Sequence, residues 1–176
     1  MVSFEKRLKE KLKALQNEEY KDHLLTFEEL GVDFLFVDEA HAYKNLYTYT
    51  KMTNVAGVNT SKSLRASDMY MKCQYLLEKN HGRGVVFATG TPISNSMSEL
   101  YTLQRFLQPD ELARMRLTTF DRWASTFGKV VSAPEITPEG SGFRMKNRFA
   151  KFHNLPELMR SFQLVADIQT SEQLKL

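Results

Sequence analysis

Two short apolar runs interrupt a chain in which apolar and polar residues otherwise recur at helical spacing. The runs cover residues 34–37 (Phe-Leu-Phe-Val) and 84–88 (Gly-Val-Val-Phe-Ala). Neither run alternates with polar residues, which is typical of a strand buried on both faces. The sequence therefore predicts two strands of a parallel sheet beneath helices, the first over about residues 33–37.

Helices are predicted around both runs, because apolar residues return there at intervals of three and four. The predicted helices span residues 4–22, 26–30, 63–77, 94–107, 119–127 and 154–167. Thr26 and Glu29 form a capping-box pattern, and Gly31 suits the left-handed end of that short helix. Ser63 and Asn154 are placed to cap the helices that follow them.

Strands that alternate with helices favour an α/β fold, with an open parallel sheet and helices on both of its faces. Residues 43–60 are rich in Tyr, Thr and Asn and show no clear period, so we expect a loop there. Residues 129–152 contain two prolines and two glycines flanked by residues of extended type, which indicates a hairpin or an ordered loop.

The composition is that of a globular domain with a sizeable core: 42% of the 176 residues are hydrophobic and 26% are charged. A net charge of +3 permits a polyanionic partner without requiring one. The single cysteine, Cys73, excludes an internal disulfide and fits a reducing compartment. No apolar run approaches the roughly 20 residues of a membrane span. The start is not a secretory signal, so we expect a cytoplasmic protein without a membrane partner.

The strongest chemical signal is the acid pair Asp38 and Glu39, which directly follows the first predicted strand. The carboxyl end of a parallel strand faces the ligand crevice, where a divalent cation would offset the charge. In nucleotide hydrolases one such acid holds Mg²⁺, usually through water, and a second can activate the attacking water. His41 could link this site to the next strand by a hydrogen bond. The alternative is an acid pair that caps a following helix.

The second signal, Thr89-Gly90-Thr91-Pro92, ends the second predicted strand. Gly90 lets the backbone approach a neighbour closely, and the two threonine hydroxyls add short donors and acceptors. Taken alone, this segment is an ordinary strand-to-helix turn.

Together the two segments resemble motifs II and III of the helicases. Motif II is matched by Asp38, Glu39, Ala40, His41, Lys44 and Asn45, and motif III by residues 88–96 with Glu99, Leu100, Tyr101, Phe106 and Leu107 behind them. The residues of these motifs resemble those of the Swi/Snf-type translocase branch of the DEAD/DEAH superfamily, and within it those of the large bacterial and phage helicases. Some of those are fused to an adenine-specific DNA methylase.

The resemblance implies a fold as well as a function. It implies a three-layer RecA-like partial domain of the P-loop NTPase type, with a mainly parallel sheet. Residues 1–128 would form the latter half of the first motor lobe, and residues 129–176 a hairpin and helix that extend the same domain. The family members are ATP-driven motors that move along duplex DNA.

Site roles follow from the same resemblance. Asp38 would bind Mg²⁺ through water, and Glu39, the other acid of the metal site, would activate the hydrolytic water. His41 and the segment Thr89, Gly90, Thr91 and Pro92 would couple the nucleotide state to DNA binding and to contact between lobes.

Two parts of such a motor are missing from the sequence. No Gly-x-x-x-x-Gly-Lys-Ser/Thr phosphate loop occurs, and neither does a second lobe with its arginine finger. We therefore expect this chain alone neither to bind ATP tightly nor to hydrolyse it; Mg²⁺ and ATP would be cofactors of a longer parent protein. Two alternatives remain open: a non-catalytic binding or regulatory module that keeps the fold, and another metal-dependent phosphoryl-transfer enzyme.

Nucleic-acid contact is a further hypothesis for a basic and aromatic segment, residues 143–153. Its cations Arg144, Lys146 and Arg148 could follow a backbone while its phenylalanines stack on bases. The alternative is a hairpin with its phenylalanines packed inward and its charges in water. We count Lys44 and Asn45 as further candidates for contact with double-stranded DNA.

Overall fold

The computed structural model describes residues 25–52, 55–56, 58, 63–94, 96–137, 139 and 142–174, apart from the side chain of Ala150. The predicted helix over residues 4–22 lies outside the described residues. The chain divides into two units, residues 1–32 and 33–176, which we describe separately.

In the first unit, the described residues form the predicted capping box as a turn. The Thr26 N–H donates to Glu29 Oε2 over 2.8 Å, and the Glu29 N–H donates to Thr26 Oγ1 over 3.3 Å. Gly31 has a φ of 65°, the left-handed conformation that the sequence predicts.

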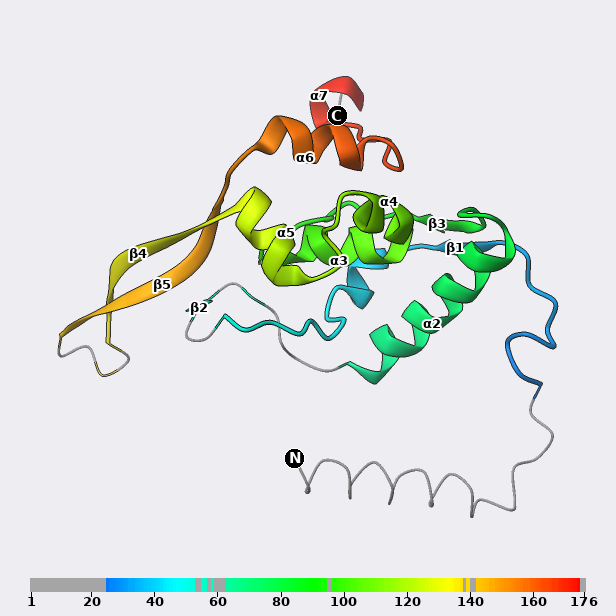
Figure 1. Ribbon diagram of the computed structural model, residues 1–176, viewed down its shortest axis with the longest axis horizontal. Coiled ribbons are helices and arrows are strands. Elements are labelled where there is room, and N and C mark those ends of the chain that lie inside the picture. Colours follow the sequence, from blue (N-terminus) through cyan, green and yellow to red (C-terminus); the bar gives the residue numbers. More distant parts are fainter. Residues whose placement is uncertain are drawn as a thin grey trace, which may run out of the picture. The chain divides into compact units, whose positions relative to one another are not determined.

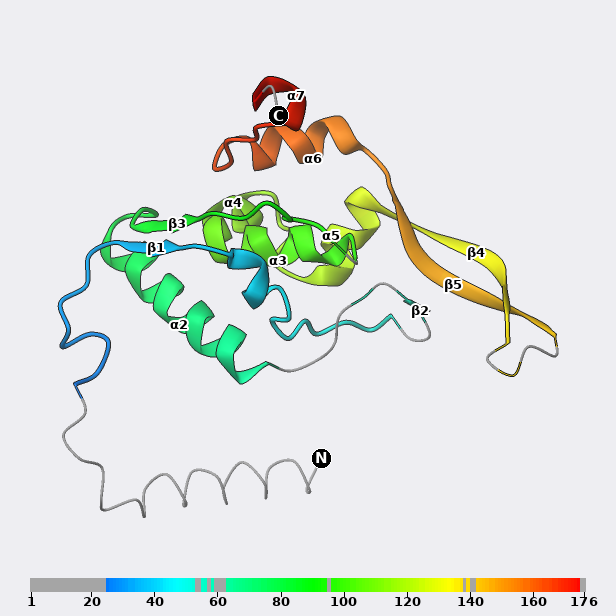
Figure 2. The ribbon, with the colours of Figure 1, turned by 180° about the vertical axis from the view of Figure 1, so that it is seen from behind.

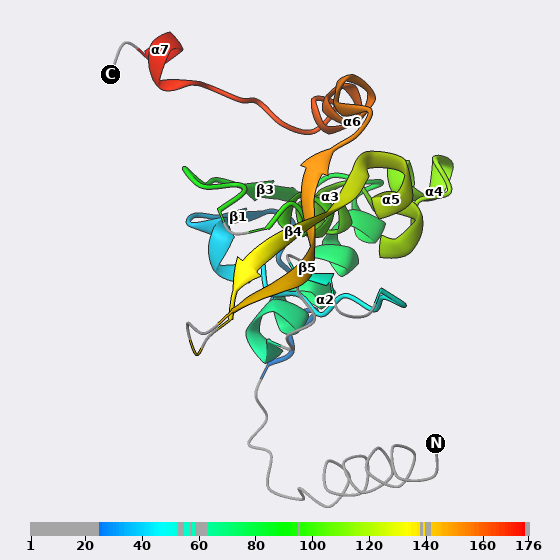
Figure 3. The ribbon, with the colours of Figure 1, turned by 90° about the vertical axis from the view of Figure 1, so that its left-hand side faces the viewer.

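The second unit begins with a parallel pair of strands, β1 (Leu35–Val37) and β3 (Val85–Phe87). They lie side by side in Figures 2 and 3, with Leu35 opposite Val85 and Val37 opposite Phe87. The crossover between them carries α2 (Leu64–Lys79), which Ser63 caps by accepting the Ala66 N–H, as predicted. The mixed α/β architecture is thus confirmed.

Only one face of this strand pair is covered within the described residues. Leu35, Val85 and Phe87 pack against a cluster built from α2 and α3 (Ser98–Leu107). On the other face Phe36 is 72% exposed and Val86 is 44% exposed. The prediction of strands buried on both faces, with helices on both sides of the sheet, is therefore wrong for this part of the chain. A continuous apolar run does not reveal whether a second covering layer is supplied.

Gly84 is required where β3 begins. Its φ is +98°, and a Cβ there would lie 2.5 Å from Asn80 Nδ2 and 2.9 Å from the Asp33 carbonyl oxygen. Because its own carbonyl accepts the Leu35 N–H over 2.8 Å, this glycine sets the first rung between the strands.

The chain after β3 is mostly helical, and it differs from the prediction in four places. α3 starts at Ser98, four residues later than expected, and Pro109 opens a new helix, α4 (Pro109–Arg114), at the position where its missing N–H costs least. α5 (Phe120–Phe127) follows as predicted. α6 (Leu155–Phe162) ends well before residue 167, because its buried face ends at Phe162. A short α7 (Ser171–Leu174) was not predicted, although Thr170 and Gln173 form a capping box ahead of it.

A long hairpin extends from α5, as Figure 1 shows. β4 (Gly128–Ile136) and β5 (Phe143–Phe152) pair antiparallel from Gly128 opposite Phe152 to Ile136 opposite Phe143. The hairpin prediction for this segment is confirmed. A two-residue strand, β2 (Val55–Ala56), pairs parallel with β5 inside the predicted loop over residues 43–60. A short 3₁₀ helix, η1 (Ala40–Tyr43), precedes this loop and was not predicted.

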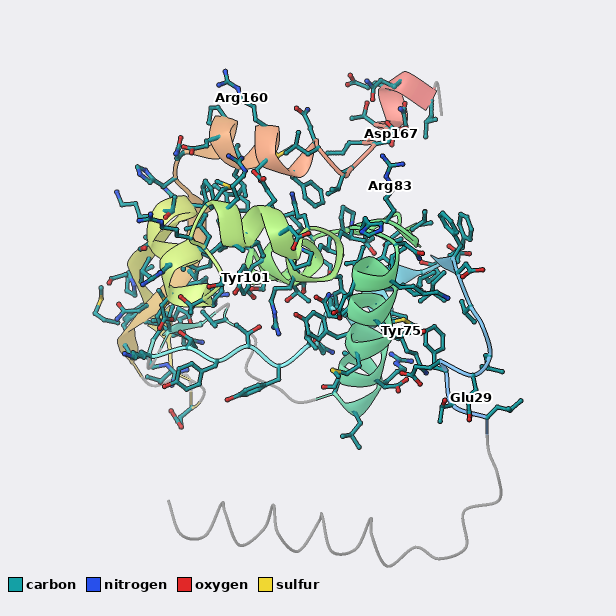
Figure 4. The ribbon with its side chains drawn as sticks, turned by 45° about the vertical axis from the view of Figure 1, so that its right-hand side comes forward. Glu29, Tyr75, Arg83, Tyr101, Arg160 and Asp167 are labelled. Carbon is teal, nitrogen blue, oxygen red and sulfur yellow. The ribbon has the colours of Figure 1, made fainter. Side chains whose placement is uncertain are left out.

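The main core is aromatic and joins α3, α5, β5 and α6. Trp123 and Phe120 are almost fully buried there, and the Tyr101 hydroxyl donates to the Thr118 carbonyl over 2.7 Å (Figure 4). The buried residues of this core are Leu100, Tyr101, Leu103, Leu112, Leu117, Phe120, Trp123, Ala124, Phe127, Phe149, Leu158 and Phe162. It therefore draws on both the helical segment and the hairpin extension.

Buried amides cross this core in a continuous chain of hydrogen bonds. Trp123 Nε1 donates to Gln104 Oε1 over 2.7 Å, and Gln104 Nε2 donates to Gln108 Oε1 over 3.1 Å. Gln108 Nε2 then donates to the Ser161 carbonyl over 3.1 Å. Each of these buried amides has a partner, so the chain ties α5, α3 and α6 together without an unpaired polar group.

Candidate functional site

The two acids lie where the sequence predicts, at the carboxyl end of β1. Val37 is buried, whereas Asp38 and Glu39 are exposed. Asp38 Oδ1 accepts the Glu39 N–H over 2.8 Å. Glu39 has a φ of 51° and a ψ of 44°, a left-handed conformation that a non-glycine residue adopts at some cost. Although Glu39 precedes η1, its side chain makes no capping hydrogen bond. The interpretation of Glu39 as a helix cap is therefore not supported.

His41 joins the acids to the second predicted site segment. Its Nδ1 lies 3.1 Å from Glu39 Oε2 and 3.2 Å from Thr89 Oγ1, at the end of β3. The backbone makes the same connection, because the Ala40 N–H donates to the Ala88 carbonyl over 3.0 Å. The hydrogen bond expected between His41 and the next strand is thus present.

The segment after β3 is an exposed bend over residues 90–93. Thr89 Oγ1 accepts the Thr91 N–H over 3.1 Å, which fixes the start of the bend. A Cβ on Gly90 would meet nothing within 4 Å. None of the described residues therefore requires glycine at this position.

A second contact, which the sequence did not indicate, joins the same two loops. Lys44 Nζ lies 3.2 Å from Glu99 Oε1, with the Lys44 side chain 18% exposed and the Glu99 side chain 5% exposed. Glu99 Oε2 accepts the Ser94 N–H over 2.7 Å, and Lys44 also donates to Ser94 Oγ. The Lys44 ammonium is thus turned toward a buried carboxylate. An acid in the first turn of a helix that continues with Leu100, Tyr101 and Leu103 is the signal that could have identified Glu99. Asn45, the other nucleic-acid candidate here, is exposed.

The two exposed acids at this edge of the sheet can be compared with what a bound Mg²⁺ requires. Among the residues that the structure describes, no three His, Cys, Asp or Glu side chains gather to hold a metal ion. Mg²⁺ does not need such a cage, since it is usually held by one or two carboxylates together with water and substrate phosphates. The exposed Asp38 and Glu39 carboxylates fit that requirement.

The other predicted cations lie on the hairpin, which is separate in space from the loops that follow β1 and β3 (Figures 1 and 2). Arg148 lies 2.6 Å and Lys146 3.1 Å from the Glu135 carboxylate on the opposite strand. These contacts hold the pKa of Glu135 below its ordinary value, mainly through the hydrogen bond from Arg148. Within the described residues Arg144 has no acidic partner. Two of the three candidate cations therefore share one acidic partner, which the sequence did not reveal.

The phenylalanines of this segment divide between core and solvent. Phe149 is 2% exposed and belongs to the aromatic core, whereas Phe143 is 78% exposed near the tip. Beside the hairpin is a hollow of about 520 Å³, lined by Met52, Val55, Val58, Met145, Arg144 and Lys146 among others. The inward-packed alternative is therefore right for Phe149 and wrong for Phe143.

The described chain thus forms an α/β domain in which two acids and a threonine bend are joined at one sheet edge. The chain belongs to the family described as a probable helicase domain, whose model matches residues 2–170.

The chain is also similar to the Defense against restriction protein B of Escherichia phage P1. The two are 32% identical over 153 residues, which cover 85% of this chain and 7% of that protein. The chain thus corresponds to a small part of the curated relative's length. No solved structure matches it significantly. Within the described residues, no helix is both long and apolar enough to cross a membrane.

Proposed function

We propose that this chain is part of an ATP-dependent DNA helicase or translocase of the Swi/Snf-type branch. It would form the latter half of the first RecA-like lobe of a longer polypeptide. The observation that carries the proposal is the contact of His41 with both Glu39 and Thr89, which joins the two motor segments at one sheet edge. The family membership and the small share of the phage relative that the chain covers also support it.

In the proposed reaction, Asp38 would hold Mg²⁺, and Glu39 would orient and deprotonate the attacking water. The ion supplies charge neutralisation at the transferred phosphoryl group when ATP is bound. The left-handed backbone at Glu39 turns its carboxylate toward His41. His41 then carries a change at the nucleotide to Thr89 and to the bend behind it.

The remaining parts of the motor are expected on other segments of the same polypeptide. These are the phosphate loop, the second lobe and, as in some relatives of this branch, a methylase domain. Without the backbone amides and lysine of a phosphate loop, the triphosphate loses most of its binding partners. The isolated chain is therefore expected to be inactive, and double-stranded DNA is the partner proposed for the longer protein.

A non-catalytic binding or regulatory module is the alternative function. The exposed apolar face of Phe36 and Val86 and the exposed Phe143 give such a module surfaces to bind with. The coding sequence around the chain distinguishes the two proposals. A phosphate-loop lysine upstream and a second lobe downstream favour the motor, whereas their absence favours the module.

An ATPase assay tests the motor proposal. ATP turnover is measured with and without duplex DNA for this chain and for the longer polypeptide that contains it. We expect DNA-stimulated turnover from the longer polypeptide and none from the isolated chain. The Glu39→Gln variant of the longer polypeptide should retain bound ATP while its turnover nearly disappears. An exposed acid outside the site, Glu78, gives the matched control Glu78→Gln. DNA-stimulated turnover by the isolated chain, or Glu39→Gln turnover near the parental rate, would contradict the proposal.

A further inference from the structure

Glu99 lies in a buried part of the fold. It occupies the first turn of α3, and every residue from Ser98 to Gln104 in that helix is buried. A carboxylate near a helix N-terminus is favourably placed in the field of the helix. A buried carboxylate is nevertheless costly unless charged and hydrogen-bonding partners surround it. Glu99 has such partners in the Lys44 ammonium and in the Ser94 N–H and hydroxyl.

These partners come from the two loops that carry the motor segments. Lys44 is the residue directly after η1, in the loop that starts with the acids. Ser94 directly follows the exposed bend over residues 90–93. The loops are therefore joined twice: by His41 and Thr89 next to the strands, and by Lys44, Ser94 and Glu99 further out. Between these joints the bend over residues 90–93 is exposed.

We infer that Glu99 is a positioning residue that makes the loop after β1 and the bend after β3 move as one. The inference rests on the proposed function and adds a residue to it. Loss of the Glu99 charge should leave the acids and their immediate contacts in place. It should weaken the link between the bend and Lys44, which would keep only the hydrogen bond from Lys44 to Ser94 Oγ, so that less of the effect of DNA engagement reaches the loop that carries Glu39.

The test compares Glu99→Gln with wild type in the longer polypeptide. The amide keeps an oxygen for the Ser94 N–H and removes the charge that faces Lys44. We expect the turnover without DNA and the KM for ATP to be unchanged. The stimulation of kcat by DNA should fall by about tenfold, which lies within the usual range of coupling between sites. Glu78→Gln, which makes the same change on exposed α2 surface, should retain full stimulation.

A double-mutant cycle checks that the pair acts as a unit. If it does, Lys44→Met and Glu99→Gln should each reduce the stimulation, and the double variant should reduce it no further than either single variant. Full stimulation in Glu99→Gln overturns the inference, as does an equal loss of turnover with and without DNA. If Glu99→Gln fails to fold, the double variant is tested instead, because it buries neither charge. Full stimulation by DNA in the double variant also overturns the inference. A wild-type polypeptide that DNA does not stimulate would instead overturn the proposed function.

Discussion

His41 and Thr89 are 48 positions apart in the chain, yet Nδ1 of the histidine lies 3.2 Å from Oγ1 of the threonine. The contact is possible because β1 and β3 are parallel and end at the same edge of their sheet. Each residue has a second partner: Glu39 for the histidine and the Thr91 N–H for the threonine. The pair therefore connects an acid at the end of one strand to a bend at the end of the other.

Thr89→Val should break this connection and leave the shape of the side chain almost unchanged. The substitution removes Oγ1, so the His41 ring loses one of its two Nδ1 partners and its Nδ1 environment changes. We expect a clear change in the ¹⁵N chemical shift of His41 Nδ1 in the isolated chain. Thr89→Ser retains the hydroxyl and serves as the control. An unaltered histidine spectrum in the valine variant would contradict the contact.

Glu135→Gln should increase the affinity of the hairpin for DNA if its cations bind phosphates. At neutral pH Glu135 is ionised, since its pKa lies below the ordinary value, and its one carboxylate pairs with both Lys146 and Arg148. The glutamine variant would release both cations. We expect tighter binding. The slope of log affinity against log salt should become steeper by about one to two, because two phosphate contacts are added.

Glu139→Gln is the matched control for this change, because it alters the net charge equally at an exposed residue of the same hairpin. Equal affinities for the two variants would show that the local pairing has no effect. The triple replacement of Arg144, Lys146 and Arg148 by Ser should reverse the gain, and unchanged salt-dependent binding would favour the hairpin as a purely structural element.

Gly128→Ala should destabilise the fold at the junction of α5 and β4. A Cβ at this position would lie 1.8 Å from the ring of Phe149, which is buried in the aromatic core. Overpacking of this kind costs roughly 1–3 kcal/mol of unfolding free energy, measured by urea denaturation. Gly90→Ala is the control, because its Cβ would meet nothing within 4 Å. Equal stability of the two variants would refute the steric account, whereas partial recovery on adding Phe149→Leu would support it.

The Cys73 thiol should be protected in the folded chain. It is fully buried on α2, and burial raises its pKa from 9.0 to about 12. At pH 8 a thiol reagent should therefore label the chain only after denaturant unfolds it. Because the unfolded thiol loses its proton first, the unfolding free energy should fall as the pH rises from about 9 toward 12. Rapid labelling without denaturant would contradict the burial.

The sequence was sufficient for the features that local pattern determines. The apolar runs of β1 and β3 appear as strands, Ser63 caps α2, and Gly31 adopts its left-handed turn. The alternation of strands with helices predicted that β1 and β3 are parallel. Parallel strands end at the same edge of a sheet, so the meeting of the acid pair and the threonine bend could also be predicted.

The features that the sequence missed depend on partners distant in the chain. β2 has two residues and exists only because β5 pairs with it. Glu99 and Glu135 are ordinary acids until the fold brings Lys44 to one and Arg148 to the other. The exposed face of β1 was missed for a related reason, since an apolar residue such as Phe36 does not indicate whether a covering layer is present.

The ten-residue helix α3 has a consequence for mechanical transmission through this domain. Its first turn holds Glu99 against the loops, and its last turn and C-cap carry Gln104 and Gln108, which lead to α6. At 1.5 Å per residue these two ends are about 15 Å apart along a rigid rod. A force applied at α6 would thus reach the acid-bearing loop through α3, by way of the Gln108 hydrogen bond to Ser161 at one end and the Glu99 ion pair with Lys44 at the other.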